Sequence, residues 1–140
     1  MEVIYDKRNE WYVVKEKIDN QTFFMEFQIY DETDDTVYFN ICMGVYNKRK
    51  HAGRNENEAR ITGSNPMKTV AVAMKAFDML EEEVLYRRKD KRKHISCGWV
   101  DNRRRDAYYK FLSRKGYQYG NIDGYKCIYK VYEVNNEKTD

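Results

Sequence analysis

The hydrophobic pattern of this chain changes from strand-like alternation to helical spacing at residue 66, and that change most constrains its fold. Apolar residues alternate with others over Phe23–Tyr30 and Val37–Tyr46, as expected of strands with one face on a core. Trp11–Ile18 is a third apolar, β-branched run, and it ends at the turn signal Asp19-Asn20. From Pro66 to Arg87 the apolar residues recur at helical spacing, so this segment is predicted to be a helix.

A second strand and a second helix are predicted after the first helix. His94–Val100 has a strand-like pattern, Asp101 can cap a helix over Asn102–Lys115, and Gly116 can close that helix. A turn at 121–124 precedes a strand at Tyr125–Val134, and residues 135–140 are expected to form a disordered tail.

This order of elements predicts the fold class. A strand, a helix and a strand in succession imply a parallel pair joined by a crossover, attached here to an antiparallel meander. A short run at Glu58–Thr62 is compatible with a fourth strand ahead of the first helix. We therefore expect an α+β fold with a mixed, mostly antiparallel sheet, in a single domain over residues 1–134.

Composition narrows the class of protein. The 140 residues suffice for one core, and the 41% hydrophobic and 15% aromatic fractions mean that neither disulfides nor a metal are needed to build it. Three cysteines are an odd number without metal-site spacing, so Cys42, Cys97 and Cys127 are predicted to be reduced, half-buried strand residues. No apolar run approaches the ~20 residues of a membrane span, and the first ten residues include charges where a signal peptide needs an apolar stretch, which predicts a cytoplasmic protein. Many Lys, Asn and Tyr residues and one Pro are typical of an AT-rich genome, such as that of a phage or a low-GC bacterium.

The turn before the first predicted helix is a candidate anion site. Its backbone N–H groups and the positive end of the helix dipole point beyond the helix start, which Ser64 or Asn65 can cap. The spacing of Arg60, Gly63 and Asn65 resembles the pyrophosphate-binding signature of the GNAT superfamily of N-acetyltransferases, Gln/Arg-x-x-Gly-x-Gly/Ala. Asn65 departs from the Gly or Ala of that signature. The alternative interpretation is an ordinary capped turn with proline in the first helical position.

The later elements resemble the same family. In GNAT proteins the fifth strand is followed by a helix that carries Asn, Ala and Tyr and ends at Gly. Asn102, Ala107 and Gly116 stand at similar places in the second predicted helix here. The family's tyrosine, which gives a proton to the departing CoA thiolate, corresponds to Tyr109 when counted forward from Asn102. Counted back from Gly116 the position is Leu112, and neighbouring Tyr108 fits core packing better.

Charged residues complete the expected site. Arginines in the first turn of a helix are unfavourable next to its dipole unless an anion is close, and this turn holds Arg103, Arg104 and Arg105. In GNAT proteins the CoA phosphates lie between the amino ends of two neighbouring helices, so the resemblance implies that at least one of these arginines, with Arg103 and Arg104 as candidates, reaches the phosphates. The alternative is a solvated basic face.

The resemblance places a general base at Glu58, near the end of the presumed fourth strand. His51 and His94 are expected to lie in basic surface segments and support no metal or nucleophile site.

The resemblance implies an acyl-CoA-dependent N-acetyltransferase that transfers an acetyl group from acetyl-CoA to an amine. The cosubstrate would lie in the splay between the fourth and fifth strands. The alternative is a non-catalytic GNAT-like binding module, phage-encoded, that engages a host protein, a nucleotide or nucleic acid through the basic segment 87–94. No metal or membrane role is expected, and a homodimer is left open.

Overall fold

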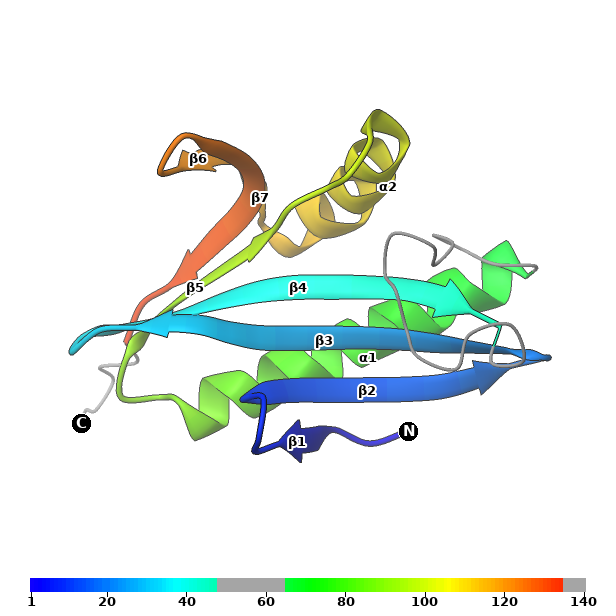
Figure 1. Cartoon of the computed structure of the whole chain (residues 1–140), viewed down its shortest axis with the longest axis horizontal. Helices are drawn as coiled ribbons and strands as arrows, with labels where there is room; N and C mark the ends of the chain where they lie inside the picture. Colours follow the sequence, from blue (N-terminus) through cyan, green and yellow to red (C-terminus); the bar gives the residue numbers. More distant parts are fainter. Residues whose placement is uncertain (48–64, 135–140) are drawn as a thin grey trace. The chain divides into compact units, whose positions relative to one another are not determined.

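The strands that the structure describes form one seven-stranded sheet with the order β1-β2-β3-β4-β5-β7-β6 (Figure 1). A computed structural model describes residues 1–47 and 65–134. Strands β4 and β5 pair in parallel, whereas the pairs β1–β2, β2–β3, β5–β7 and β6–β7 are antiparallel. The predicted α+β class with a mixed, mostly antiparallel sheet is therefore confirmed. The strands are β1 (Ile4–Asp6), β2 (Trp11–Ile18), β3 (Gln21–Glu32), β4 (Thr36–Tyr46), β5 (Arg92–Cys97), β6 (Gln118–Ile122) and β7 (Tyr125–Tyr132).

Within residues 1–47 and 65–134 the chain forms two α-helices, α1 (Pro66–Arg87) and α2 (Asn102–Leu112), and a short 3-10 helix, η1 (Ser113–Lys115), continues α2. The bounds of α1 and β2 agree with the predictions from hydrophobic spacing. Neither helix is long and apolar enough to cross a membrane, as far as the described residues extend.

The chain divides into two compact units, Met1–Gln28 with Cys42–Glu83, and Ile29–Ile41 with Val84–Asp140. The expectation of a single domain over residues 1–134 stays a prediction.

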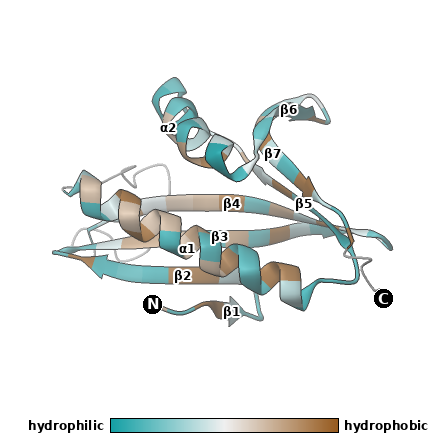
Figure 2. Ribbon diagram, turned by 180° about the vertical axis from the view of Figure 1, so that it is seen from behind, coloured by the Kyte–Doolittle hydropathy of each residue, from teal (hydrophilic) through white to brown (hydrophobic). Residues whose placement is uncertain are grey.

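In the first unit α1 covers one face of the sheet, along which it runs in Figure 2. Phe77 of α1 meets Phe27 of β3 edge to face, with ring centroids 5.6 Å apart. Ala73, Phe77 and Leu80 recur every three or four residues, and all three are buried, so they form the packing stripe of the helix.

The opposite face of the first unit also carries buried side chains. Phe24, which alternates with Phe23 and Met25, is fully buried and packs with Cys42 and Tyr46 of β4. Strand β3 is thus buried on both faces from Phe23 to Phe27. Continuous burial explains why this stretch holds three phenylalanines and a methionine where a half-exposed strand would alternate.

In the second unit β5 lies between β4 and β7. Its register with β4 runs from Thr36↔Arg92 to Asn40↔Ser96. Beyond the last pair β4 continues for six residues, to Tyr46, whereas β5 continues for one, to Cys97.

Helix α2 begins at Asn102 as predicted but ends at Leu112, and the predicted end at Lys115 is that of the 3-10 helix η1. The side chain of Asp101 accepts a hydrogen bond from the backbone N–H of Arg104 at 2.8 Å, which is the expected N-cap. Gly116 closes η1 at φ +91°, a left-handed conformation that favours glycine. The apolar side of the helix is defined by Tyr108 and Leu112, both buried.

Several predicted bounds were wrong. Strand β5 ends at Cys97 instead of Val100 and begins earlier, at Arg92, although the run around Arg92 is basic. The short strand β1 was not predicted, and β6 extends to Ile122, which shortens the turn to Asp123 and Gly124. The proposed strand over 58–62 and the tail 135–140 lie outside the described residues.

Cys42, Cys97 and Cys127 are free strand residues as predicted, but all three are buried and not half-buried.

Candidate functional site

Four of the nine predicted site residues lie outside the described residues, namely Glu58, Arg60, Gly63 and Ser64, and so does His51. Of the rest, Asn65 belongs to the first unit, and Asn102, Arg103, Arg104 and Tyr109 belong to the second. The second unit therefore carries the part of the predicted site that the structure brings together.

Asn65 is the cap of α1. Its Oδ1 accepts a hydrogen bond from the backbone N–H of Lys68 at 3.2 Å, and its Nδ2 donates to Asp19 at 3.3 Å. Thr69 adds a bond from its hydroxyl to the Asn65 carbonyl at 2.9 Å. The Asn65 side chain thus fixes the helix start and ties it to the turn between β2 and β3.

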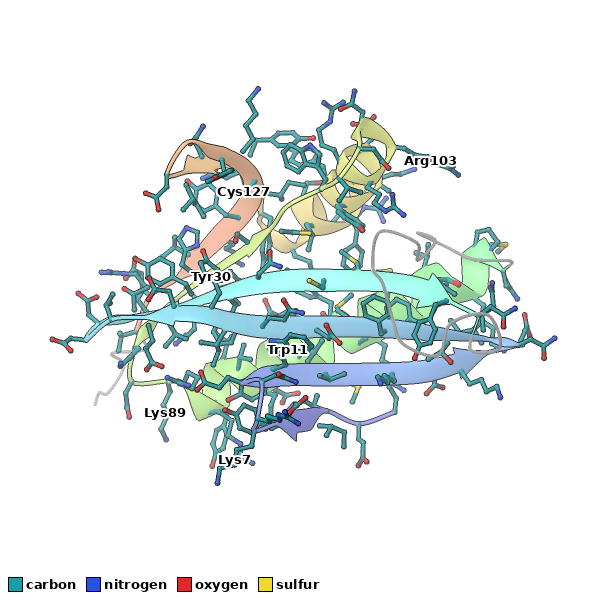
Figure 3. All side chains as sticks on the ribbon, in the orientation of Figure 1. Lys7, Trp11, Tyr30, Lys89, Arg103 and Cys127 are labelled. Carbon is teal, nitrogen blue, oxygen red and sulfur yellow. The ribbon has the colours of Figure 1, made fainter. Side chains whose placement is uncertain are left out.

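The three arginines in the first turn of α2 differ in their partners. Arg104 is bound to the N-cap, because its Nη1 lies 2.7 Å from Oδ2 of Asp101, and its side chain is only 16% exposed. Arg105 pairs with Asp106 at 3.0 Å and reaches Oδ1 of Asn102 at 3.5 Å. Arg103 is exposed and has no ion-pair partner within residues 1–47 and 65–134 (Figure 3), so it is the arginine best placed to meet an added anion.

The Asp101 carboxylate is held ionised by this arrangement. The Arg104 backbone N–H lowers the pKa of Asp101 most, and the charge and the side-chain hydrogen bond of Arg104 lower it further. A fixed negative charge thus sits at the amino end of α2, where it also offsets the positive end of the helix dipole.

The two tyrosines of α2 have different environments, as the sequence suggested. Tyr108 is 8% exposed and belongs to the core, whereas Tyr109 is half-buried. The Tyr109 ring stacks on Tyr119 of β6, with centroids 4.2 Å apart and planes 12° apart. Trp99, just after β5, meets Tyr119 edge to face at 6.1 Å. Trp99, Tyr109 and Tyr119 therefore form one aromatic cluster, which joins α2 to the β6–β7 hairpin.

Leu112, the alternative tyrosine position counted back from Gly116, is fully buried in the core. It offers no functional group.

A row of rings on the second unit was not anticipated. Tyr30, Tyr38, His94 and Tyr129 follow one another across β3, β4, β5 and β7, with centroid separations of 6.1, 5.5 and 5.3 Å. Desolvation by burial is the main cause that raises the pKa of Tyr30. Each of these rings comes from a different strand. Side-chain alternation predicts the face of its own strand on which a residue lies, but the neighbours across four strands depend on strand register, which the sequence alone does not give.

His94 is half-buried in this row and does not lie in a surface segment, which corrects the sequence-based interpretation. Its ring stacks on Tyr129 with planes 5° apart, and its Nδ1 is buried without a hydrogen-bond partner in the part of the chain described. Burial lowers the pKa of His94, against a smaller opposing effect of its own backbone.

The cations of the basic segment 87–94 are largely engaged within the second unit. Arg88 and Lys91 both bind the carboxylate of Glu32, and Arg92 pairs with Glu133 at 2.9 Å. Lys93 is 2% exposed, and its Nζ donates to the backbone carbonyl of Arg88 at 3.1 Å. Charge that looks free in the sequence is therefore mostly committed to structure.

Glu26 is a buried carboxylate that the sequence analysis did not single out. It lies in the middle of β3, is 1% exposed and accepts a hydrogen bond from Nε2 of Gln28 at 2.8 Å. Its place in the alternation of β3 was visible, but its burial follows from packing on the second face of the strand.

The described residues contain no group of three His, Cys, Asp or Glu side chains arranged to hold a metal ion. Comparison of the chain with protein-family models, with curated proteins and with solved structures finds no match.

Proposed function

We propose that the protein is an acyl-CoA-dependent N-acetyltransferase that transfers the acetyl group of acetyl-CoA to an amine. The observation that carries the proposal is the parallel pairing of β4 with β5. The other strand pairings described above are antiparallel. The five residue pairs between β4 and β5 end while β4 still has six residues to run. A parallel pair beside an antiparallel meander is what the resemblance to the GNAT superfamily implies. Strand β4 corresponds to the predicted strand Val37–Tyr46, and the expected fourth strand over 58–62 lies outside the described residues.

The second support is the order of elements after β5. The strand is followed by the capped helix α2, the left-handed Gly116 and the strands β6 and β7, in keeping with the family's later half. Asn102 and Tyr109, the residues that the resemblance proposes when counted forward from Asn102, both belong to α2.

Arg103 would bind the cofactor phosphates. It is exposed at the first turn of α2, and the neighbouring Arg104 and Arg105 are already paired with carboxylates. A cation without a partner at a helix start gains more from a phosphate than one already in an ion pair.

Tyr109 would act on the leaving group. In the proposed step the amine nitrogen attacks the thioester carbonyl carbon, the C–S bond breaks, and the thiolate takes the proton of the Tyr109 hydroxyl. Stacking on Tyr119 fixes the plane of the Tyr109 ring and hence the line along which its hydroxyl points. Glu58, outside the described residues, remains the proposed base that removes a proton from the amine.

Thermal unfolding with acetyl-CoA tests cofactor binding. A ligand present at about 100 times its Kd stabilises the folded state by about 2.7 kcal/mol, so the full chain should melt several degrees higher with saturating acetyl-CoA. Arg103→Gln should reduce that shift, whereas Lys75→Gln, an exposed charge in the middle of α1, should not. An unchanged melting temperature with acetyl-CoA and with CoA would refute the proposal.

Turnover tests the role of Tyr109. With a panel of amine acceptors, Tyr109→Phe should lower kcat about 10²-fold or more while the acetyl-CoA-induced thermal shift persists. Tyr108→Phe is the matched control, because Tyr108 is a buried core residue of the same helix, and its kcat should change little.

A non-catalytic binding module is the second candidate, and one observation favours it. Asn65 occupies the last position of the phosphate-binding signature, and its side chain is engaged by Lys68 and Asp19. Acetyl-CoA binding without turnover on any amine of the panel would select this alternative.

A further inference from the structure

Strand β6 forms an open edge of the sheet. It stands last in the strand order, and β7 is its one paired neighbour among the strands in residues 1–47 and 65–134 (Figure 1). Gln118 and Asn121 are exposed, and Tyr119 is 47% exposed although its ring stacks on Tyr109. The edge strand is therefore accessible from solvent.

This edge lacks the features that usually prevent a strand from pairing with another chain. Edge strands are commonly protected by charged side chains, by proline or by a bulge. Strand β6 reads Gln-Tyr-Gly-Asn-Ile, without charge or proline, in a chain of which 35% of the residues are charged. Its five pairs with β7 are consecutive, so no bulge interrupts it. By contrast, β1 at the other edge is three residues long, ends at Asp6 and is followed by Lys7 and Arg8.

The turn of the β6–β7 hairpin determines which backbone groups of β6 bond to β7. Asp123 and Gly124 both have positive φ, 51° and 86°, as in a two-residue turn of type I′. Such a turn closes the hairpin with Ile122 and Tyr125 as a hydrogen-bonded pair. In an antiparallel ladder these pairs alternate with pairs that exchange no hydrogen bond.

Two residues of β6 consequently direct their backbone groups away from β7. Counted back from Ile122, every second residue bonds to β7, which includes Gly120 and Gln118. The intervening residues, Tyr119 and Asn121, therefore point their N–H and C=O groups outward. The edge offers two donors and two acceptors to a further strand.

The outward groups are arranged to match those of an identical strand. Tyr119 and Asn121 flank Gly120. In an antiparallel copy related by a two-fold axis at Gly120, Tyr119 of each chain faces Asn121 of the other, and each such pair exchanges two hydrogen bonds. The two copies of Gly120 then face each other at a Cα separation of about 4.5 Å, where the absence of side chains permits the approach.

The ring of Tyr129 extends this match beyond the backbone. It lies over Gly120, since a Cβ atom built there would stand 2.1 Å from Cε1 of the ring. Tyr129 is half-buried and stacks on His94 at the end of the row of rings. The two-fold axis brings the Tyr129 rings of both copies towards each other on one face, so that pairing covers ring surface that a single chain leaves in contact with water.

We propose that β6 pairs antiparallel with β6 of a second copy of this chain, about a two-fold axis at Gly120, and that the protein is thereby a homodimer. The contact uses the same strand of both copies, so it closes after two chains and does not continue into a fibre. A second copy fits this edge better than an unrelated extended peptide, because the residues around Gly120 supply both halves of the hydrogen-bond pattern.

The mass of the full chain in solution tests the dimer. Sedimentation equilibrium between about 1 and 500 µM, without acetyl-CoA, should show the weight-average mass rising from 17.0 kDa to twice that value and no further. Because acetyl-CoA is absent, the result does not depend on the acetyltransferase proposal.

Asn121 tests the backbone pairing. Asn121→Pro removes an N–H group that points outward, so the hairpin keeps its own bonds while two of the four bonds between the copies are lost. The dimer should dissociate at least about tenfold more readily. Asn121→Ala is the matched control, because it shortens the same side chain but keeps the N–H, and its dissociation constant should change less than about twofold. Circular dichroism and thermal melts establish that both variants are folded.

Disulfide trapping tests the register. The proposed axis places Gln118 of one copy opposite Ile122 of the other, at a Cα separation of about 4.5 Å that a disulfide can span. An equimolar mixture of Gln118→Cys and Ile122→Cys chains should form a covalent dimer under mild oxidation. Neither variant alone should do so, and the unaltered chain, whose three cysteines are buried, is the blank.

The proposal is overturned if the chain stays at 17.0 kDa up to the highest concentration, or if the mass grows beyond that of two chains. It is also overturned if proline and alanine at position 121 weaken the dimer equally, or if either cysteine variant alone is trapped as efficiently as the mixture.

Discussion

The ring of Tyr129 on β7 lies directly over Gly120 on the neighbouring strand β6. A Cβ atom built on Gly120 would stand 2.1 Å from Cε1 and 2.6 Å from Cδ1 of that ring, far inside van der Waals contact. The same ring stacks on His94 on its way across the sheet. Because Gly120 has no side chain, the ring of Tyr129 has room to occupy its place at the end of the row of rings.

Gly120→Ala should destabilise the protein by about 1–3 kcal/mol, because Tyr129 must leave its place or the strands must move apart. The free energy of unfolding in urea measures the loss. Gly98→Ala is the control, since nothing lies within 4 Å of a Cβ at that position, and it should change stability by less than about 0.5 kcal/mol. In a Tyr129→Ala background the Gly120→Ala cost should nearly vanish, and a cost that persists there would refute the contact as its cause.

His94 should make stability fall on acidification. Burial lowers the pKa of His94 in the folded state, so the unfolded chain, near the ordinary value of about 6.5, binds the proton more tightly. The stability contributed by the neutral ring is present above about pH 6.5 and is lost as the pH falls below it. Urea unfolding at about pH 7.5 and about pH 5.5 should show a smaller difference for His94→Phe than for the unaltered chain, whereas Tyr38→Phe should leave the difference unchanged.

Glu32 joins the β3–β4 hairpin to the turn before β5, and replacing it should cost stability. Hydrogen bonds from Lys91 and Arg88 lower the pKa of Glu32, so its contribution is present above about pH 4.3 and is lost as the pH falls. Because the group is partly exposed, Glu32→Gln should cost about 0.5–1 kcal/mol at neutral pH. Glu133→Gln removes the more exposed pair with Arg92 and should cost less. Equal losses would contradict the weight given to the Glu32 pair.

The Asp101 cap should contribute to the stability of α2. Asp101→Ala removes the bond to the Arg104 N–H and should lower the melting temperature by roughly 3–5 °C, measured by thermal unfolding. Asp101→Asn keeps an oxygen acceptor at the cap and should recover most of that loss. If alanine and asparagine behaved alike, the cap would not be what holds the first turn of α2.

Local patterns predicted much of the fold. The spacing of apolar residues indicated the bounds of α1 and β2, and Asp101 and Gly116 marked the start and the close of the second helical segment. Each of these signals acts within a few residues, so no knowledge of tertiary contacts was needed.

The errors arose where tertiary contacts overrode local composition. Lys93 lies in a basic run ahead of the predicted start of the strand at His94. Its aliphatic stem is nevertheless buried in β5, and its Nζ reaches the Arg88 carbonyl. Burial lowers the pKa of Lys93, because removing a charged ammonium group from water costs free energy. No local sequence pattern predicts a lysine in such a place. The lysine stays there because its strand is held between β4 and β7.

The site was less predictable than the fold. The sequence distinguished Tyr108 from Tyr109 by helical phase, and the structure bears out that Tyr108 is the buried one. It did not identify Tyr119 as the partner of Tyr109, because the two rings come from different elements. The partners of Arg104 and Arg105 likewise depend on where two nearby aspartates point.

The boundary between the two compact units runs through β3 and β4 and not through a linker. A fragment that starts at Val84 would lack Thr36–Asn40, the segment with which β5 pairs, and Glu32, to which Arg88 and Lys91 bind. A fragment that stops at Glu83 would leave Thr36–Asn40 of β4 without β5, the strand with which it pairs. Dissecting this protein therefore calls for a circular permutation or for coexpressed pieces, because no single cut of the polypeptide separates its halves.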